Sequence, residues 1–423
     1  MISRQELKIM KTNSLKKDYI WNTVGALTIS ATSLIYTVIM SRFCNLNDVG
    51  IFSFAFSFAC MIVTLASFGG RTFQVTDTKG EIKTSTYIIT RYITVLLSYL
   101  LVIIFALIKN YNIEKTLIIL ILCIFKFLEE LSDVYYGILQ KRKKLYKVGQ
   151  YQFIKSIINI ILFCIGIIFI KNLIVTVLLI TLNNTIFLFC IERKKAEKLE
   201  TWHLKFDKKE IIALLEVNFY ICGFTFFSTY LINAPKYAID TYLTNDIQAI
   251  FNMLIMPATL MLLIGGFIIN PILVDVAEKY EKRKNNELKS MITKVICYLL
   301  LFGVLALIAS YFLGTWALGI IYGLSFTKYK TELLIVIVGA ILYTFVTILG
   351  QILIAFRKIK IQLVIAVLCS IFAYVISNVL VPKLGLSGGI YSYLITMIFR
   401  TICYIPLIFS IFKKGTSDKN EKN

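Results

Sequence analysis

Residues 41–77 read SRFCNLNDVGIFSFAFSFACMIVTLASFGGRTFQVTD, and residues 239–275 read IDTYLTNDIQAIFNMLIMPATLMLLIGGFIINPILVD. Each stretch has an Asn-Asp pair, an Ile-Phe pair, a long apolar run and a Gly-Gly pair, in that order. Aligning the Ile-Phe pairs places Arg71 opposite Asn270 and Val75 opposite Val274. Internal repeats are common in transporters, so the pattern indicates a duplicated helical unit.

The composition excludes a set of soluble globular domains. Of the 423 residues, 58% are hydrophobic and only 16% are charged, and the mean hydropathy is +0.78. The nine cysteines stand singly and the only histidine is His203, so the sequence contains no CxxC pair or His/Cys cluster for a metal. The net charge of +21 is typical of a membrane protein with basic cytoplasmic loops, and we expect no nucleic-acid partner.

Apolar runs of about 20 residues are long enough to cross a hydrocarbon core of about 30 Å. The chain contains twelve of them, which predicts an all-α polytopic membrane protein with about 12 transmembrane helices. The predicted spans are 20–41, 49–69, 87–108, 117–138, 153–170, 173–191, 211–233, 248–270, 291–313, 332–356, 360–381 and 388–412. The fifth and sixth are separated only by Lys171-Asn172.

The basic residues alternate from loop to loop. The amino terminus and every second connection after it hold 33 of the 45 Lys and Arg residues, whereas the opposite connections hold eight. Under the positive-inside rule this alternation predicts a multi-pass protein of the cytoplasmic membrane with both termini in the cytoplasm.

The longest charged connection divides the predicted spans into two equal sets. We expect an N-terminal six-helix lobe at 1–191, a basic cytoplasmic linker at 192–210, a C-terminal six-helix lobe at 211–412 and a polar cytoplasmic tail at 413–423. Because six is even, both lobes have the same orientation, which predicts a parallel repeat about a pseudo-two-fold axis along the membrane normal.

Arg400 lies about twelve residues, or about 18 Å, from either end of the last predicted span. A side chain cannot reach the membrane surface over that distance, and an intramembrane charge normally faces the protein interior. Arg400 is therefore a candidate cavity cation for binding a substrate; the alternative is a structural ion pair.

The fourth predicted span contains Lys126, Glu129, Glu130 and Asp133. Their spacing places Lys126, Glu130 and Asp133 on one helical face, and it predicts a Lys126–Glu130 pair. Lys155 on the next span is a candidate partner for Asp133. Two interpretations stay open: a neutralised contact between helices, or a polar cavity wall with a carboxylate for a coupling ion.

Four further charged residues lie near the predicted membrane faces: Arg42, Arg71, Lys236 and Asp240. Interfacial anchoring explains each of them, and a site in the cavity is the alternative. Enzyme signatures are missing, because no Gly-rich phosphate loop or Ser/His/Asp set is present and the connections are short. We therefore expect no catalytic residues, no metal and no enzyme.

Several segments resemble one family of exporters. SRFCNLNDVGIFSFAFSF, FLEELSDVYYGILQKRKKLYKVG and IIYGLSFTKYKTELLIVI resemble the second, fourth and tenth helices of Wzx-type polysaccharide and O-antigen flippases, with their flanking loops. KYAIDTYLTNDIQAIFNMLIMPATLMLLIGGFIINP resembles their seventh-to-eighth helix segment. These flippases belong to the multidrug/oligosaccharidyl-lipid/polysaccharide exporter superfamily, and the similarity in topology covers nearly the whole chain.

The resemblance implies a V-shaped pair of lobes around a central cavity. It implies transport of an oligosaccharide linked to undecaprenyl-type isoprenoid pyrophosphate from the inner to the outer leaflet, for capsule or O-antigen synthesis. Partners would be this lipid, membrane lipids and, as candidates, a polysaccharide polymerase and a chain-length regulator; we expect a monomer.

The candidate residues divide by charge in this interpretation. Cations that would shield the pyrophosphate are Arg400, Lys126, Arg71, Arg42 and Lys236. The acids that would hold these cations or bind a coupling ion are Glu129, Glu130, Asp133 and Asp240. No cofactor is expected beyond a coupling H⁺ or Na⁺. The alternatives are a cation-coupled multidrug antiporter of the same superfamily and, from a different class, a membrane-embedded transferase acting on lipid-linked sugars.

Overall fold

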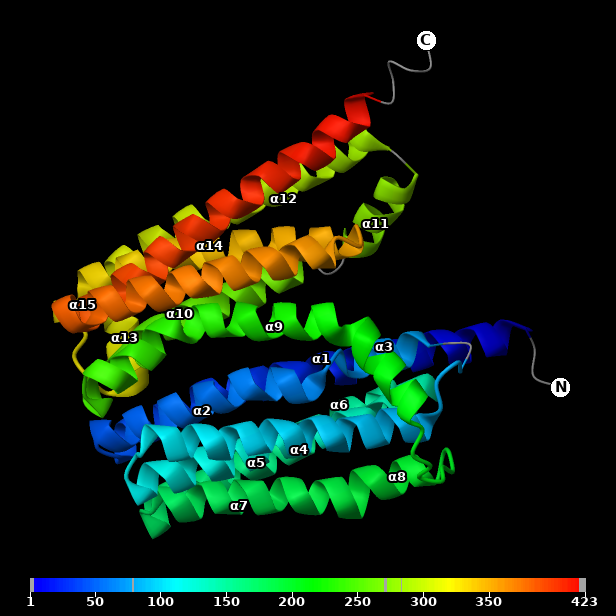
Figure 1. Cartoon of the computed structure of the whole chain (residues 1–423), viewed down its shortest axis with the longest axis horizontal. Coiled ribbons are helices and arrows are strands. Elements are labelled where there is room, and N and C mark those ends of the chain that lie inside the picture. The colour runs from blue at the N-terminus through cyan, green and yellow to red at the C-terminus, as the bar shows by residue number, and fades with distance from the viewer. Residues whose placement is uncertain (1–3, 78–79, 270–271, 283, 418–423) are drawn as a thin grey trace. The chain divides into compact units, whose positions relative to one another are not determined.

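The computed structural model describes residues 4–77, 80–269, 272–282 and 284–417 (Figure 1). These residues form helices joined by short connections, and no strand occurs among them. The chain divides into two compact units, Met1–Cys222 (unit 1) and Gly223–Asn423 (unit 2). The predicted all-α class is thus confirmed.

Unit 1 is built from long helices, several of which are followed directly by a short helical segment. The bounds are α1 (Arg4–Phe43), α2 (Leu46–Ser67), α3 (Gly70–Thr76), α4 (Thr84–Lys109), α5 (Ile113–Lys141), α6 (Leu145–Cys164), α7 (Leu173–Ile186), α8 (Arg193–Glu197) and the first part of α9 (Lys208–Tyr242). The π-helical segments η1 (Ile165–Ile170) and η2 (Phe187–Glu192) extend α6 and α7.

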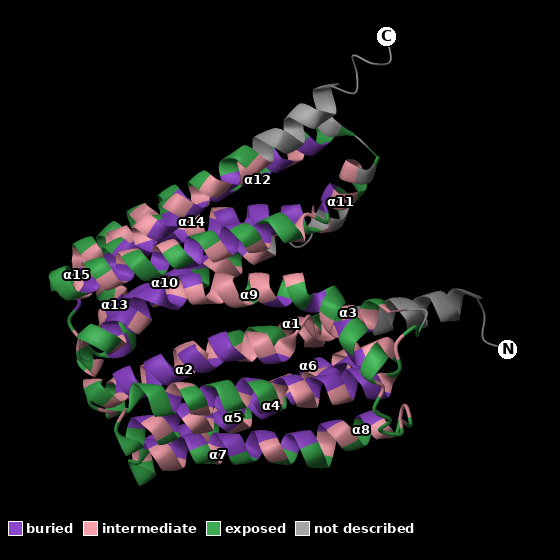
Figure 2. Cartoon of the chain, in the orientation of Figure 1, coloured by how far each residue is buried: buried purple, intermediate pink, exposed green. Residues whose placement is uncertain are grey.

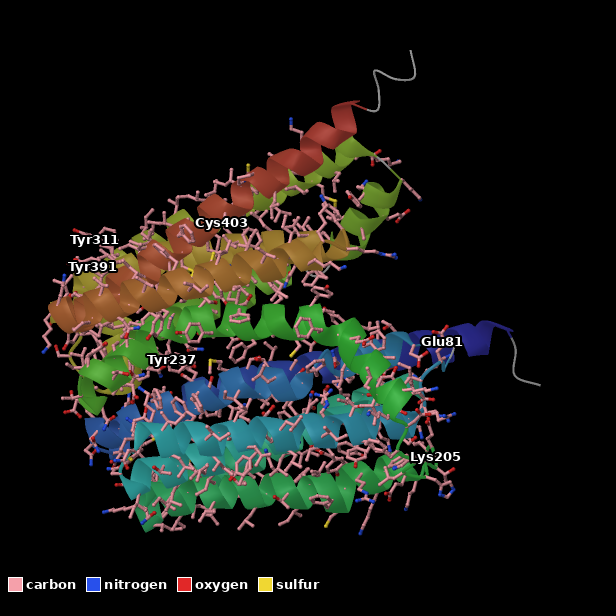
Figure 3. The ribbon with its side chains drawn as sticks, viewed as in Figure 1. Glu81, Lys205, Tyr237, Tyr311, Tyr391 and Cys403 are labelled. Atoms are coloured by element: carbon pink, nitrogen blue, oxygen red, sulfur yellow. The ribbon has the colours of Figure 1, made fainter. Side chains whose placement is uncertain are left out.

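Unit 2 contains the remainder of α9 and six further α-helices. They are α10 (Asn245–Ile269), α11 (Leu273–Glu281), α12 (Asn285–Ala309), α13 (Thr315–Tyr322), α14 (Lys330–Ala355) and α15 (Ile359–Ser417). The π-helical η4 (Ser310–Gly314) joins α12 to α13, and the 3₁₀ turn η5 (Thr327–Tyr329) precedes α14. The exposed tyrosines Tyr311 and Tyr391 lie at the same end of unit 2 (Figure 3), a placement typical of a membrane–water interface.

The helices account for the twelve predicted spans. Ten described helices are long and apolar enough to cross a membrane. The charged residues of α5 keep this 29-residue helix out of that set. The helix α15 contains two spans, because Gly385 has a non-helical φ of 61° and ψ of −133°. Adding α5 and the second arm of α15 to the ten gives twelve.

The predicted junction between the fifth and sixth spans is confirmed. Lys171 adopts a left-handed φ of 56° at the end of η1. Asn172 then caps α7, because its side-chain oxygen accepts a hydrogen bond of 3.0 Å from the Val175 N–H. This is the usual role of Asn before a helix.

The two repeated stretches have the same element pattern. In unit 1 a long helix, α2, is followed by the short α3, and in unit 2 the long α10 is followed by the short α11. The first copy breaks at Gly69 and Gly70, whose φ angles of 90° and 61° suit glycine. Asn270, which the alignment placed opposite Arg71, lies outside the described residues.

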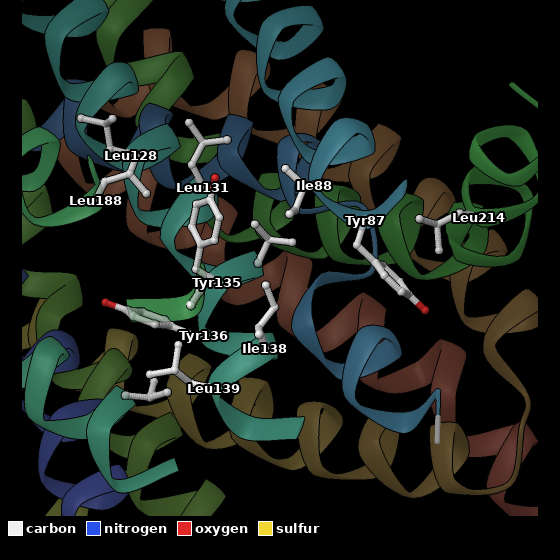
Figure 4. Packing of buried hydrophobic residues seen from close by; sticks show 13 residues of the cluster. Tyr87, Ile88, Leu128, Leu131, Tyr135, Tyr136, Ile138, Leu139, Leu188 and Leu214 are labelled. Carbon is white, nitrogen blue, oxygen red and sulfur yellow. The ribbon is translucent and has the colours of Figure 1, made fainter. Parts of the chain in front are cut away.

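The core of unit 1 is centred on α5 (Figure 4). Leu131, Tyr135 and Leu139 from this helix pack with Ile88 of α4 and Leu188 of η2 in one buried cluster. Buried residues run along the length of α5, whereas α4 exposes one apolar face (Figure 2). The exposed leucines and isoleucines of α4 suit contact with lipid tails.

The connection at 192–210, which was predicted as a basic cytoplasmic linker, packs on unit 1. Glu200 pairs with Arg142 at 3.2 Å, and Lys83 pairs with Glu210 at 2.7 Å. The rings of Trp202 and Tyr135 lie 5.9 Å apart. The division between the two compact units falls inside α9, after Cys222.

Asp77 binds several groups at the end of unit 1 where Glu81 and Lys205 lie (Figure 3). Burial alone would raise the pKa of the Asp77 carboxyl, but backbone hydrogen bonds from Glu81 and Ile82 lower it below its ordinary value. Lys141, at 3.9 Å, and the Tyr87 hydroxyl lower this pKa further.

Close packing of α1 against α6 depends on Gly149. A Cβ atom at this position would lie 2.0 Å from the Trp21 carbonyl oxygen, which is part of the backbone and cannot move aside. A Cβ on Gly303 of α12 would instead meet only the flexible side chain of Ile341, at 3.0 Å.

We expect Gly149→Ala to destabilise unit 1 by about 1–3 kcal/mol, the usual cost of overpacking. The measurement is the melting temperature of the purified full chain in detergent, with Gly303→Ala as the matched control. Equal melting temperatures for the two variants would contradict the packing described here.

Candidate functional site

A charged face runs along the middle of α5. Lys126, Glu129, Glu130 and Asp133 follow one another at helical spacing and are all only partly exposed. The rest of the helix is largely buried and apolar. Charges at this depth of a membrane helix need a charged partner or water, because hydrocarbon does not solvate charged groups of either sign.

Each of the three carboxylates in the middle of α5 has a cationic partner. Lys126 Nζ lies 2.9 Å from Glu129 Oε2, and Arg91 of α4 binds Glu130. Arg71 Nε lies 3.6 Å from Asp133 Oδ1, and the Arg71 backbone N–H donates to Asp133 Oδ2 at 3.2 Å. We refer to these three pairs as the α5 ladder.

The ladder corrects two predicted pairings. Lys126 was expected to bind Glu130, but it binds Glu129, because Arg91 from α4 takes Glu130. Asp133 was expected to bind Lys155, but it binds Arg71 instead. The Arg91 side chain is only 7% exposed within α4.

A second network is fully buried beside the ladder. Lys155 Nζ of α6 lies 2.9 Å from Glu192 Oε1 of η2, and it donates to Ser132 Oγ at 3.3 Å. The Tyr136 hydroxyl also donates to Glu192. Side-chain exposure is 6% for Lys155 and zero for Glu192. No sequence pattern marked Glu192, which lies at the edge of the predicted linker.

Three asparagines extend this network between α6 and α7. Asn159 donates to Asn184 at 2.9 Å and accepts from Asn183 at 2.8 Å. Their polarity inside apolar helices was visible in the sequence, but their mutual contact depends on how α6 packs on α7. The contact satisfies amide groups that would otherwise be costly to bury.

A small polar cavity lies beside the break between α2 and α3. Its volume is about 20 Å³, and Gly70, Thr90, Arg91 and Asn218 are among its lining residues. Thr90 Oγ1 and Asn218 Oδ1 are buried and have no hydrogen-bond partner in the protein. A cavity of this size and polarity suits one ordered water molecule.

Unit 2 contains a different kind of charge. Arg400 on α15 is 3% exposed, and its Nε and Nη1 atoms have no hydrogen-bond partner in the structure. Its guanidinium carbon lies 6.0 Å from the ring centre of Tyr343 and 5.7 Å from that of Tyr404. Cation–π attraction stabilises such a placement only in part, so the guanidinium keeps donors for an anion or water.

The remaining predicted residues lie away from the ladder or in unit 2. Arg42 is exposed in the last turn of α1. The 22 residues of α2, or about 33 Å of helix, separate it from α3. Lys236 is buried and Asp240 half-buried on the part of α9 in unit 2, and both interact with other groups. Arg71 and Lys126 are thus two predicted cations that pair with the predicted acids of α5.

Removing one member of the Lys155–Glu192 pair leaves the other charge buried without its partner. We expect Lys155→Met to cost about 3–5 kcal/mol of stability, whereas the double variant Lys155→Met/Glu192→Leu recovers most of it. Thermal unfolding in detergent measures both. Lys83→Met, which breaks a pair on the exposed surface, is the control with little expected effect. A double variant as unstable as the single one would contradict a pairwise role.

No family model matches the chain. The capsular polysaccharide biosynthesis protein CapF of Staphylococcus aureus is 24% identical over 408 residues, covering 94% of this chain and all of that protein. Among solved structures, the lipid II flippase MurJ in an inward closed conformation has a TM-score of 0.71 at 16% identity. It covers 94% of this chain and 90% of its own.

An inward-facing multidrug resistance MATE transporter has a TM-score of 0.63 at 14% identity, covering 92% of this chain and 96% of its own. It belongs to the MOP superfamily. These neighbours are transporters and flippases, not enzymes. The comparisons confirm the predicted resemblance to Wzx-type flippases: the chain is a multi-pass membrane protein whose fold is similar to the folds of MurJ and this MATE transporter.

Proposed function

We propose that this protein moves an isoprenoid-pyrophosphate-linked oligosaccharide from the inner to the outer leaflet of the cytoplasmic membrane, for cell-surface polysaccharide synthesis. Transport proceeds by alternating access, with both termini in the cytoplasm. The fold and the capsule-synthesis relative support this assignment.

The observation that carries the proposal is the partly exposed charge at membrane depth in the α5 ladder. The side chains of Arg71, Asp133, Glu129 and Lys126 are 25%, 26%, 29% and 13% exposed. Such groups do not face hydrocarbon, so they support an aqueous surface on which cations receive an anionic head group.

Arg400 adds a cation whose donors are not saturated. Guanidinium groups bind phosphate through several N–H donors, which suits a pyrophosphate. Export of an anion is favoured by an inside-negative potential, by about 2.3 kcal/mol per charge per 100 mV. The potential therefore supplies a driving force for this substrate; an additional coupling H⁺ or Na⁺ belongs to the same proposal.

The cation-coupled drug antiporter is the second candidate, because MATE transporters share the fold. Such a protein needs accessible acidic groups for cationic drugs. Each acid of the α5 ladder is instead occupied by a basic residue of unit 1. This occupancy favours the flippase.

Replacement of Arg400 tests the proposal. The gene for this protein is deleted, and the strain is complemented with the wild-type or variant protein at matched expression. We expect Arg400→Ala to lower surface polysaccharide at least about tenfold and Arg400→Lys to retain part of it, because lysine keeps the charge but not the planar donors. The measurement is surface polysaccharide together with lipid-linked repeat units accumulated on the cytoplasmic side.

Thr396→Val is the matched control, since Thr396 is a buried neighbour on α15 whose hydroxyl also has no hydrogen-bond partner. It should leave polysaccharide near the wild-type amount. Unchanged polysaccharide in the deletion strain, with raised sensitivity to cationic dyes, would overturn the flippase and favour the antiporter.

A further inference from the structure

The three pairs of the α5 ladder differ in how many of the cation's N–H donors are engaged and in how close the contact is. Lys126 and Glu129 make a direct contact of 2.9 Å, and Arg91 is nearly buried on Glu130. The Arg71–Asp133 pair is looser, with 3.6 Å between Nε and Oδ1. In addition, Arg71 Nη1 is buried and has no hydrogen-bond partner. Asp133 therefore fills only part of the Arg71 donor set.

Asp133 is held independently of the Arg71 side chain. Its Oδ2 atom accepts the Arg71 backbone N–H at 3.2 Å, at the start of α3. This contact remains when the guanidinium swings away, so Asp133 keeps a hydrogen bond in either arrangement. A carboxylate that loses every partner in this setting would carry a large desolvation cost.

The Arg71 side chain is also partly exposed, whereas its unpaired Nη1 atom is buried. About a quarter of each side chain of the pair is exposed, against zero for Glu192 in the neighbouring buried pair. In the proposed orientation, α3 lies toward the cytoplasm, where the lipid-linked substrate binds first. A phosphate offers more acceptor oxygens than one carboxylate and suits the unfilled donors.

We infer that Arg71 and Asp133 form an exchangeable pair: Arg71 receives the pyrophosphate of the substrate, and Asp133 competes for the same guanidinium and so drives release. This inference rests on the proposed flippase function and adds the residues that set affinity and release. The exchange replaces one anion by another on Arg71, so neither step leaves the guanidinium without a counter-charge.

The two members of the pair then have opposite effects on binding, which a purely structural ion pair does not. Asp133→Asn removes the competing charge but keeps an oxygen for the Arg71 backbone N–H. We expect it to tighten the Kd for undecaprenyl pyrophosphate about three- to tenfold and to slow transport, while Arg71→Gln weakens binding about tenfold or more.

Asp77→Asn is the matched control, because it removes one negative charge from the same end of unit 1 without freeing Arg71. Binding is measured with undecaprenyl pyrophosphate and the purified full chain in lipid nanodiscs, and melting temperatures confirm folding. Equal tightening by Asp77→Asn would assign the effect to overall charge and overturn the inference.

The outcomes separate this inference from the proposed function. If the wild-type chain binds the pyrophosphate lipid but Asp133→Asn weakens binding or leaves it unchanged, the competition is absent and only the inference fails. If the folded wild-type chain does not bind the lipid at all, the proposed function fails with it. Opposite shifts for Asp133→Asn and Arg71→Gln support the exchange.

Discussion

A charged group inside a membrane helix must find a counter-charge, a dense set of hydrogen bonds, or water. In unit 1 this constraint centres on α5, which carries Lys126 and three carboxylates between positions 126 and 133. Two neighbouring helices supply counter-charges: Arg91 comes from α4 and Arg71 from α3. In the adjacent buried network, Lys155 of α6 pairs with Glu192 of η2.

The break in the second span follows from the same requirement. Phe68, Gly69 and Gly70 all have left-handed φ angles, and α3 begins where the Arg71 backbone N–H meets Asp133. In a continuous helix that N–H would donate to a backbone carbonyl oxygen of the preceding turn and would not be available to Asp133. Asn218 of α9 packs so closely on Gly69 that a Cβ there would lie 2.1 Å from its side-chain oxygen. Glycine is therefore needed both for the backbone angle and for the space.

Much of the fold could be predicted from the sequence, because it depends on local quantities. The lengths of apolar runs gave twelve spans, and Asn172 after Lys171 marked the junction of two of them. The pairing of charges could not be predicted in this way. Helical spacing allows Lys126 to reach either Glu129 or Glu130, and only the position of Arg91 on another helix decides between them. Glu192 and the packed linker were missed for the same reason.

The two units treat intramembrane cations differently, and the difference bears on how an anion could be moved. In unit 1 the cations of the α5 ladder are already neutralised, so an arriving anion gains only the excess of its own contacts over those of the carboxylate it displaces. Arg400 in unit 2 stands among tyrosine rings, with two donor nitrogens unfilled and no ion pair to an acid among the described residues. An anion meeting Arg400 would gain the full interaction, which strengthens in a medium of low dielectric constant. Exchangeable pairs favour turnover, whereas an unpaired buried cation favours capture. A transporter of an anionic head group needs both properties, and in this chain they lie on different helices.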